Sequence, residues 1–225
     1  GVNIIDIGGQ STRPGSKRIS AQEEIHRTVP AIERIVQRFP DAVISIDTYS
    51  SEVAKAAVQA GASIVNDISS GDMDNAMLTA VAALQVPYIC MHMQGTPDTM
   101  QKDPQYENVS TTVLDYLAGK AEQCREAGIN DIIIDPGFGF GKTIAHNFTL
   151  LKSLPALQII NRPIMVGLSR KSTICKVLHI TPEEALNGTT VLHTIALMNG
   201  AHILRVHDVK AAKEAIALFM AYQEV

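Results

Sequence analysis

Polar and charged side chains close a series of short apolar runs in this sequence. The closing residues are Asp6, Asp47, Asn66, Asp135, Ser169 and, in the last run, Arg205 with His207. Each run has the length and composition of a buried strand, and parallel strands place their C-terminal ends on one face of a sheet. We therefore expect these side chains to share one rim, as in an enzyme active site.

The carboxylates Asp6, Asp47 and Asp135 each end an aliphatic run, and Asn66 ends a fourth. Any one of these aspartates could instead cap the helix that follows. As a set of buried acids and amides they need hydrogen-bond partners. A flat heterocycle with ring N–H and amino donors would supply them, because a guanidine-like edge pairs with a carboxylate through two parallel bonds.

Cationic side chains lie in three segments near the same run ends. They are Arg13 beside Thr12 in a Thr-Arg-Pro turn, Arg170 and Lys171 after Ser169, and Arg205 with His207. Cations that converge on one rim indicate an anionic substrate group, most simply a phosphate or pyrophosphate. Thr12 could add a neutral donor, and a structural role for His207 remains an equal alternative.

The segment DPGFGFGKT, residues 135–143, resembles a phosphate-binding loop only superficially. Pro136 stands where that motif requires glycine, and the glycine spacing does not match a dinucleotide fingerprint. We expect a flexible loop in which Phe138 and Phe140 either pack inward or wall a ligand pocket, and in which Lys142 is solvated.

Other motifs narrow the chemistry further. His92 lies between two methionines and is expected to be structural, while Met91 could pack against an aromatic ligand. The sequence contains no HExxH motif, no Cys/His cluster and no Gly-x-Ser-x-Gly elbow. A structural zinc site and serine acyl chemistry are therefore disfavoured.

Composition indicates a globular enzyme with an aliphatic core. Of the 225 residues 46% are hydrophobic, only 4% are aromatic and none is Trp, and the net charge is -4. This balance argues against nucleic-acid binding, and no apolar run is long enough to cross a membrane. Cys90, Cys124 and Cys175 lie far apart, which is typical of reduced, mostly buried thiols in a cytoplasmic protein.

Strand-type and helical segments alternate along the whole chain. Strands are predicted at residues 2–7, 42–46, 63–66, 86–91, 131–134, 163–168 and 202–206, and helices at 20–38, 52–60, 74–84, 109–127, 145–154, 182–199 and 211–222. The repeat is about 33 residues, close to the ~31 of an eightfold barrel. We expect a single domain, residues 1–225, with the α/β fold of a TIM (β/α)8 barrel that lacks its first βα unit. The alternative is an open, doubly wound sheet.

Taken in order, the motifs resemble the dihydropteroate synthase family of bacterial folate biosynthesis over essentially the whole chain. The resemblance rests on DIGGQSTRPG at 6–15, SIDT at 45–48, VNDI at 65–68, MHMQG at 91–95, DPGFGFGK at 135–142, SRKS at 169–172 and RVHDV at 205–209. It implies a transferase that joins p-aminobenzoate to 6-hydroxymethyl-7,8-dihydropterin pyrophosphate and releases pyrophosphate, with Mg²⁺ as cofactor. It also implies a homodimer and a sulfonamide target.

The resemblance assigns roles residue by residue. Asp47, Asn66 and Asp135 would bind the pterin edge, with Asp6 in the same pocket floor and Lys171 on the pterin carbonyl. Arg205, His207, Thr12 and Arg13 would hold the pyrophosphate, and Pro14, Phe140 and Ser169 would border the p-aminobenzoate site. No general base is assigned, because an aniline nitrogen is nucleophilic without one.

The chain departs from the family pattern at two points. Gln10 stands where Glu is common, and the family's first strand, which carries an Asn ligand of Mg²⁺, is not among these residues. Two other functions stay open: a methyltetrahydrofolate:corrinoid methyltransferase, which would need no pyrophosphate rim, and a non-catalytic pterin-binding protein.

Overall fold

Parallel strands and helices alternate in the computed structural model, which describes residues 1–11, 16–97, 99–100 and 103–224. The strands are β1 (Ile4–Ile7), β2 (Val43–Asp47), β3 (Ile64–Asp67), β4 (Tyr88–Met91), β5 (Ile132–Asp135), β6 (Met165–Val166) and β7 (Ile203–Leu204). The helices are α1 (Ala21–Arg38), α2 (Ser51–Gln59), α3 (Met77–Leu84), α4 (Val109–Glu126), α5 (Ile144–Lys152), α6 (Ser172–Leu178), α7 (Leu186–Met198) and α8 (Val209–Gln223), with a 3-10 helix at Leu154–Ile160.

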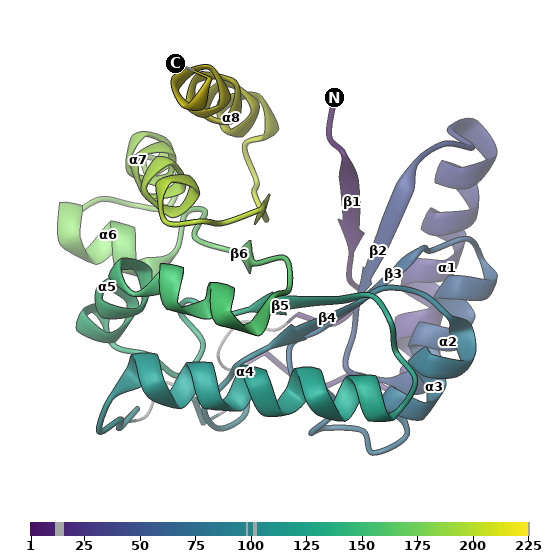
Figure 1. Ribbon diagram of the computed structural model, residues 1–225. Helices are drawn as coiled ribbons and strands as arrows, with labels where there is room; N and C mark the ends of the chain where they lie inside the picture. Colours follow the sequence, from purple (N-terminus) through teal and green to yellow (C-terminus); the bar gives the residue numbers. More distant parts are fainter. Residues whose placement is uncertain (12–15, 98, 101–102, 225) are drawn as a thin grey trace.

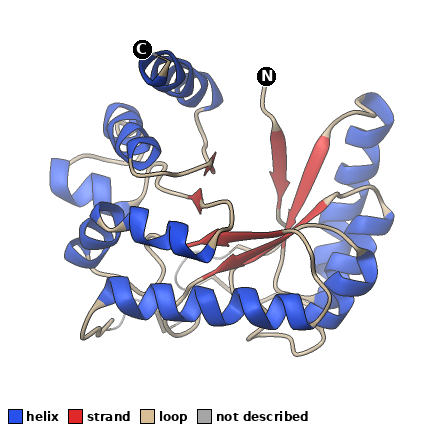
Figure 2. Cartoon of the chain, viewed as in Figure 1, coloured by secondary structure: helices blue, strands red, loops and turns tan. Residues whose placement is uncertain are grey.

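The strands pair in chain order. One sheet runs β1-β2-β3-β4-β5 and a second pairs β6 with β7, and a bridge between Ile134 and Ile164 connects the two. The helices lie on the outer side of the curved sheet (Figures 1 and 2). A doubly wound sheet would carry helices on both faces. The architecture is therefore the predicted α/β barrel type, although among the described residues no pairing joins β7 to β1.

Alternation along each strand explains how the site forms. One set of aliphatic side chains packs together inside the curved sheet: Ile4, Ile64, Ile89, Ile133, Met165 and Ile203. Because side chains alternate with a period of two, the residue two positions later points to the same interior. Those residues are Asp6, Asn66, Met91, Asp135, Gly167 and Arg205. The interior is thus aliphatic at one end and polar at the C-terminal end of the strands.

The opposite strand faces form the main hydrophobic core under the helices, which includes Ile44, Ile46, Tyr88 and Ile134. One carboxylate, Asp67, lies on this side rather than at the site. It accepts hydrogen bonds from the Tyr88 hydroxyl (2.7 Å) and from the amides of the turn that follows β3. Its role is structural.

The cysteines are free thiols, as expected. Cys90 and Cys124 are buried with their sulfur atoms 3.4 Å apart, while Cys175 is half-buried. None of the described helices is both long and apolar enough to cross a membrane.

The helix prediction for residues 182–199 was wrong at its start. Pro182 opens a turn instead, in which the Glu184 carboxylate accepts from both the amide and the hydroxyl of Thr181, and α7 begins only at Leu186. Helix α6 was not predicted, because seven residues are too few to show a helical period. The helix predicted at 74–84 begins at Met77.

Candidate functional site

A cavity of about 440 Å³ opens where the polar ends of the strands meet. Its floor is the aliphatic interior of the sheet, including Ile4, Ile89 and Ile133. Its polar wall contains Asp6, Ser169, Lys171, Arg205 and His207. An apolar floor beneath converging charges suits a flat ligand that carries an ionic group.

Arg205, directly after β7, is shared between two carboxylates. Its Nε donates to Asp6 Oδ2 (2.6 Å) and its Nη2 donates to Asp47 Oδ2 (2.5 Å). Asp6 Oδ1 is buried and has no hydrogen-bond partner among the described residues. A buried carboxylate oxygen without a donor is costly, so this atom is a ready acceptor for a ligand N–H.

Asn66 completes this group from β3. Its side-chain amide lies 3.4 Å from Asp6 Oδ2, and the register of the sheet sets Asn66 directly beside Asp47. Three neighbouring strands thus present two carboxylates and one amide in a row, the acceptor-rich edge that the sequence predicted.

Asp135 ends β5 and is oriented by the loop that follows. Its Oδ1 accepts from the Gly137 amide at 2.7 Å. Gly137 has a positive φ of 68°, and a side chain there would collide with the His92 carbonyl oxygen, so only glycine fits. Lys171 reaches across to donate to the Phe138 carbonyl, and its ammonium lies 4.8 Å from the centre of the Phe140 ring.

Ser169 and His207 link the last two loops. The Ser169 hydroxyl lies 2.9 Å from His207 Nδ1 and accepts from the His207 amide at 3.2 Å. This pair orients the imidazole ring beside Arg205, where it faces the same cavity.

Met91 and Phe140 belong to a small apolar cluster next to the polar wall. Met91 is buried against Tyr49 and Ile68, and Phe140 packs on the same cluster. Of the two phenylalanines in the loop, Phe138 is fully buried and Phe140 is only partly so.

Burial moves the charge states of the site toward neutrality. It raises the pKa of Asp47 to about 7, although the Arg205 guanidinium opposes the rise. It also raises the pKa of Asp135, against Lys171, and lowers the pKa of Lys171 to about 8, against Asp135. Groups with such shifted pKa values, gathered in one cavity, are typical of functional sites.

Ten predicted residues come together: Asp6, Asp47, Asn66, Met91, Asp135, Phe140, Ser169, Lys171, Arg205 and His207. Thr12, Arg13 and Pro14 lie outside the described residues, so their roles stay predictions.

Two cations were interpreted wrongly. Arg170 does not join the rim: its guanidinium binds both oxygens of Asp208 (2.8 and 2.9 Å) and the carbonyls of Pro182 and Glu183. Lys142 is not solvated but buried, with its ammonium 2.9 Å from His92 Nδ1. No local pattern in the sequence distinguishes a buried lysine from a solvated one, so neither contact could have been found there.

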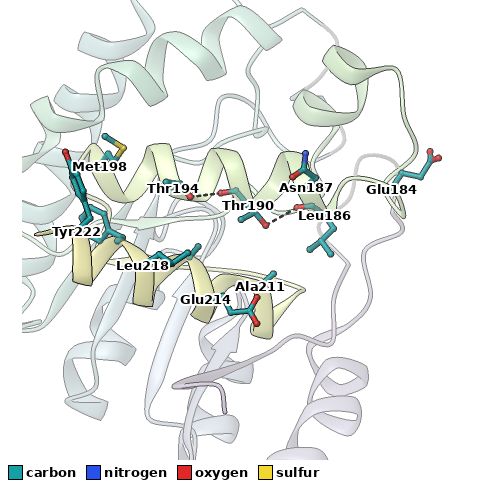
Figure 3. Close-up of a pocket in the computed structure, with 12 residues that line it drawn as sticks. Glu184, Leu186, Asn187, Thr190, Thr194, Met198, Ala211, Glu214, Leu218 and Tyr222 are labelled. Carbon is teal, nitrogen blue, oxygen red and sulfur yellow. Dashed lines mark hydrogen bonds between the residues drawn. The ribbon is translucent and has the colours of Figure 1, made fainter.

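A second hollow lies between α7 and α8 and has a different character (Figure 3). It has a volume of about 890 Å³ and a mostly apolar lining that includes Leu186, Met198, Leu218 and Tyr222. Its lining residues include Glu184 and Glu214 but no basic side chain. It is therefore not suited to an anionic substrate.

Comparison with known proteins gives a consistent result. The family model described as pterin binding enzyme matches residues 1–207. Dihydropteroate synthase of Escherichia coli K12 is 45% identical over 223 residues, which cover 98% of this chain and 78% of that protein.

Solved structures of dihydropteroate synthases are also similar to this chain. Yersinia pestis dihydropteroate synthase with a sulfonamide drug matches with a TM-score of 0.97 and 42% identity, covering 100% of this chain and 82% of that one. The Xanthomonas albilineans enzyme in complex with 7,8-dihydropteroate matches with a TM-score of 0.90 and 37% identity, covering 100% and 83%. The chain therefore belongs to the pterin-binding enzymes and, within them, to the dihydropteroate synthase family.

Proposed function

We propose that this chain joins 6-hydroxymethyl-7,8-dihydropterin pyrophosphate to p-aminobenzoate, forming 7,8-dihydropteroate and pyrophosphate. The observation that carries the proposal is the arrangement around Arg205. Carboxylates and an amide suited to a pterin edge lie directly beside cations suited to a pyrophosphate, over one aliphatic floor.

The acceptor row would hold the pterin. Asp47 and Asn66 come from the adjacent strands β2 and β3 and Asp135 from β5, and Asp6 Oδ1 offers a further buried acceptor. Amino and ring N–H donors of a pterin would satisfy these atoms, and Lys171 would donate to the ring carbonyl. The same carboxylates would stabilise positive charge that develops on the pterin as pyrophosphate leaves.

The cationic side would hold the leaving group. Arg205 and His207 face the cavity from one loop and Lys171 from another, so negative charge growing on the departing pyrophosphate would meet preorganised donors. The C–O bond to pyrophosphate breaks as the p-aminobenzoate amine attacks the exocyclic methylene carbon, and the resulting ammonium releases its proton to water. Phe140 and Ser169 would border the incoming ring.

Mg²⁺ would bind together with the pyrophosphate group of the substrate. Mg²⁺ is commonly held by phosphate oxygens and water rather than by a protein cage. The described residues contain no cluster of three His, Cys, Asp or Glu side chains that could bind a metal. Bound in that way, Mg²⁺ would neutralise part of the phosphate charge, while Arg205 and His207 hold the same group.

We also propose that the chain forms a homodimer through the outer face of α7 and α8 and resides in the cytoplasm. Leu186, Met198, Leu218 and Tyr222 are exposed on that face although they are apolar (Figure 3). A second copy would remove this surface from water. The free thiols support the location.

The test is pyrophosphate release with the pterin pyrophosphate and Mg²⁺, with and without p-aminobenzoate. We expect release that depends on p-aminobenzoate and yields dihydropteroate. Asp135→Asn should lower kcat/KM for the pterin substrate by roughly ten- to a hundredfold, the effect of losing a hydrogen bond to a charged group. The matched control is Asp131→Asn, which changes an exposed aspartate just before the same strand. It should leave kcat/KM for the pterin substrate unchanged.

Other outcomes identify the alternatives. Pterin binding without pyrophosphate release would favour a binding-only protein. Methyl transfer to a corrinoid partner would identify the methyltransferase. Either result would refute the proposed role of the cations.

A further inference from the structure

We propose that Lys142 is a positioning residue whose ammonium group is the ion around which residues 137–141 fold, and that it thereby aligns Asp135, Lys171 and Phe140 with the substrates. The alignment of substrates rests on the proposed function, whereas the folding of the loop around the ion does not. Residues 137–141 are called the glycine loop here.

The surroundings of Lys142 resemble those of a bound cation. Its side chain is buried, with 3% of the residue exposed. Its Nζ lies 2.9 Å from the Gly137 carbonyl oxygen, 3.0 Å from the Phe140 carbonyl oxygen and 2.9 Å from His92 Nδ1. An ammonium has three protons and no acceptor, so these three acceptors match its capacity, and the His92 carbonyl oxygen lies farther away at 3.4 Å.

The Gly137 and Phe140 carbonyls can only accept, so they favour the protonated form of Lys142. Burial acts against them and lowers the pKa of Lys142 to about 7, with Asp135 opposing the fall. When Lys142 is charged, His92 accepts at Nδ1 and carries its proton on Nε2. Burial and the nearby ammonium lower the pKa of His92 to about 3, which keeps the ring neutral.

The part of the glycine loop that contacts Lys142 is also the part that contacts the site residues Asp135 and Lys171. The Gly137 amide donates to Asp135, the Phe138 carbonyl accepts from Lys171, and the Phe140 ring lies beneath the Lys171 ammonium. The Gly137 and Phe140 carbonyls that face Lys142 bracket these contacts. Loss of the ammonium would leave both carbonyls buried without a charged donor, and the bracketed residues would shift.

Separate contacts hold the outer side of the same segment. Asn147 accepts from the Gly139 amide at 2.8 Å and donates to the Thr143 carbonyl at 2.7 Å. The Tyr106 hydroxyl donates to the Gly141 carbonyl at 2.8 Å. Because these anchors do not involve the ammonium, removing it should displace the inner face of the loop more than it unfolds the protein.

The test compares Lys142→Met with Lys152→Met, which replaces an exposed lysine at the end of α5. Lys142→Met should lower kcat/KM for the pterin substrate and raise the KM of p-aminobenzoate, each by about tenfold or more, because small misplacements in an active site are costly. Amide hydrogen exchange at 137–141 should become faster while the other strand ends stay protected. Lys152→Met should change neither.

Chemical rescue distinguishes an ionic role from simple packing. In Lys142→Ala, methylammonium should restore much of the lost kcat/KM and slow the exchange at 137–141, whereas tetramethylammonium at equal ionic strength, too large for the position, should not. Wild-type KM values in Lys142→Met, or rescue by neither ion, would overturn the proposal.

Two further measurements keep the proposals separate. Should Lys142→Met fail to fold, His92→Leu removes one acceptor only, and it must raise the KM of p-aminobenzoate for the proposal to stand. Should the wild-type chain show no synthase turnover, the proposed function fails. The exchange rates with and without methylammonium would still test the ion at the centre of the glycine loop.

Discussion

At the scale of single residues, Arg205 organises the site because it balances two carboxylates, the half-buried Asp6 and the buried Asp47. Its guanidinium lies between Asp6 and Asp47, so each acid has a charged partner before any ligand binds. Burial nevertheless raises the pKa of Asp47 to about 7. Near neutral pH a proton on Asp47 therefore competes with substrate binding.

This competition predicts the pH dependence of activity. Below about 7 Asp47 is mainly protonated and neutral, and above that it is ionised and can accept from the pterin and attract Arg205. We expect kcat/KM for the pterin substrate to rise with pH through about 7, since this parameter follows the pKa values of the free enzyme. The measurement is the pH profile of wild type and of Asp47→Asn.

The variant serves as the control, because titration of the substrate phosphates affects both proteins equally. Asp47→Asn should be less active and should lack the rise near 7. An identical rise in both proteins would assign it to another group.

At the scale of elements, the loops after β6 and β7 work as one unit. Arg170 has a positive φ of 52°, a strained conformation for a residue other than glycine, and its amide donates to Thr189 at 3.0 Å. Its guanidinium holds Asp208, the residue after His207. This ion pair ties the loop of Ser169 and Lys171 to the loop of Arg205 and His207.

Removing the ion pair between Arg170 and Asp208 should impair the site although Arg170 is not proposed to contact substrate. Arg170→Met should lower kcat/KM for the pterin substrate roughly ten- to a hundredfold, because the two loops lose their mutual alignment. Arg170→Lys should restore only part of the activity, since an ammonium cannot bind both oxygens of Asp208 in parallel.

The loss of activity in Arg170→Met should not be caused by a general loss of stability. Far-ultraviolet circular dichroism of Arg170→Met should match wild type at the assay temperature, so that the lost activity cannot reflect unfolded protein. Full activity in Arg170→Met would show that the two loops align independently.

At the scale of the whole molecule, the barrel separates its two surfaces of interest. The polar cavity opens at the C-terminal ends of the strands, whereas the apolar face of α7 and α8 lies on the outside (Figures 1 and 3). Helices of a monomeric barrel usually present polar side chains outward. Leu218, with 74% of its surface exposed, departs from that rule.

The proposed dimer predicts a clear effect of charge on this face. Leu218→Glu should give a monomer, because a carboxylate buried between two copies would lack a partner. Ile159→Glu is the matched control, since Ile159 is 80% exposed and does not line the hollow between α7 and α8. Light scattering after size-exclusion chromatography should show half the wild-type mass for Leu218→Glu only. A dimer in both variants would contradict the interface.

The sequence by itself determined the alternation of strands and helices and the polar ends of the strands. These features depend on neighbours one to four positions apart, so a local pattern reveals them. The period of two in Ile4-x-Asp6 and Ile133-x-Asp135 is enough to aim each carboxylate at the barrel interior. The family motifs then supplied the roles of residues such as Asn66 and Arg205.

Only the tertiary structure decided which cations serve the site. Lys142 is buried because the glycine loop folds against His92, 50 residues earlier, and Arg170 is withdrawn from the rim by Asp208, 38 residues later. Contacts at such separations leave no periodic pattern in the local sequence. The sequence neighbours of a loop lysine or arginine are the same whether its charged group is solvated or bound to a carbonyl. Burial and pairing of charge are properties of the folded chain.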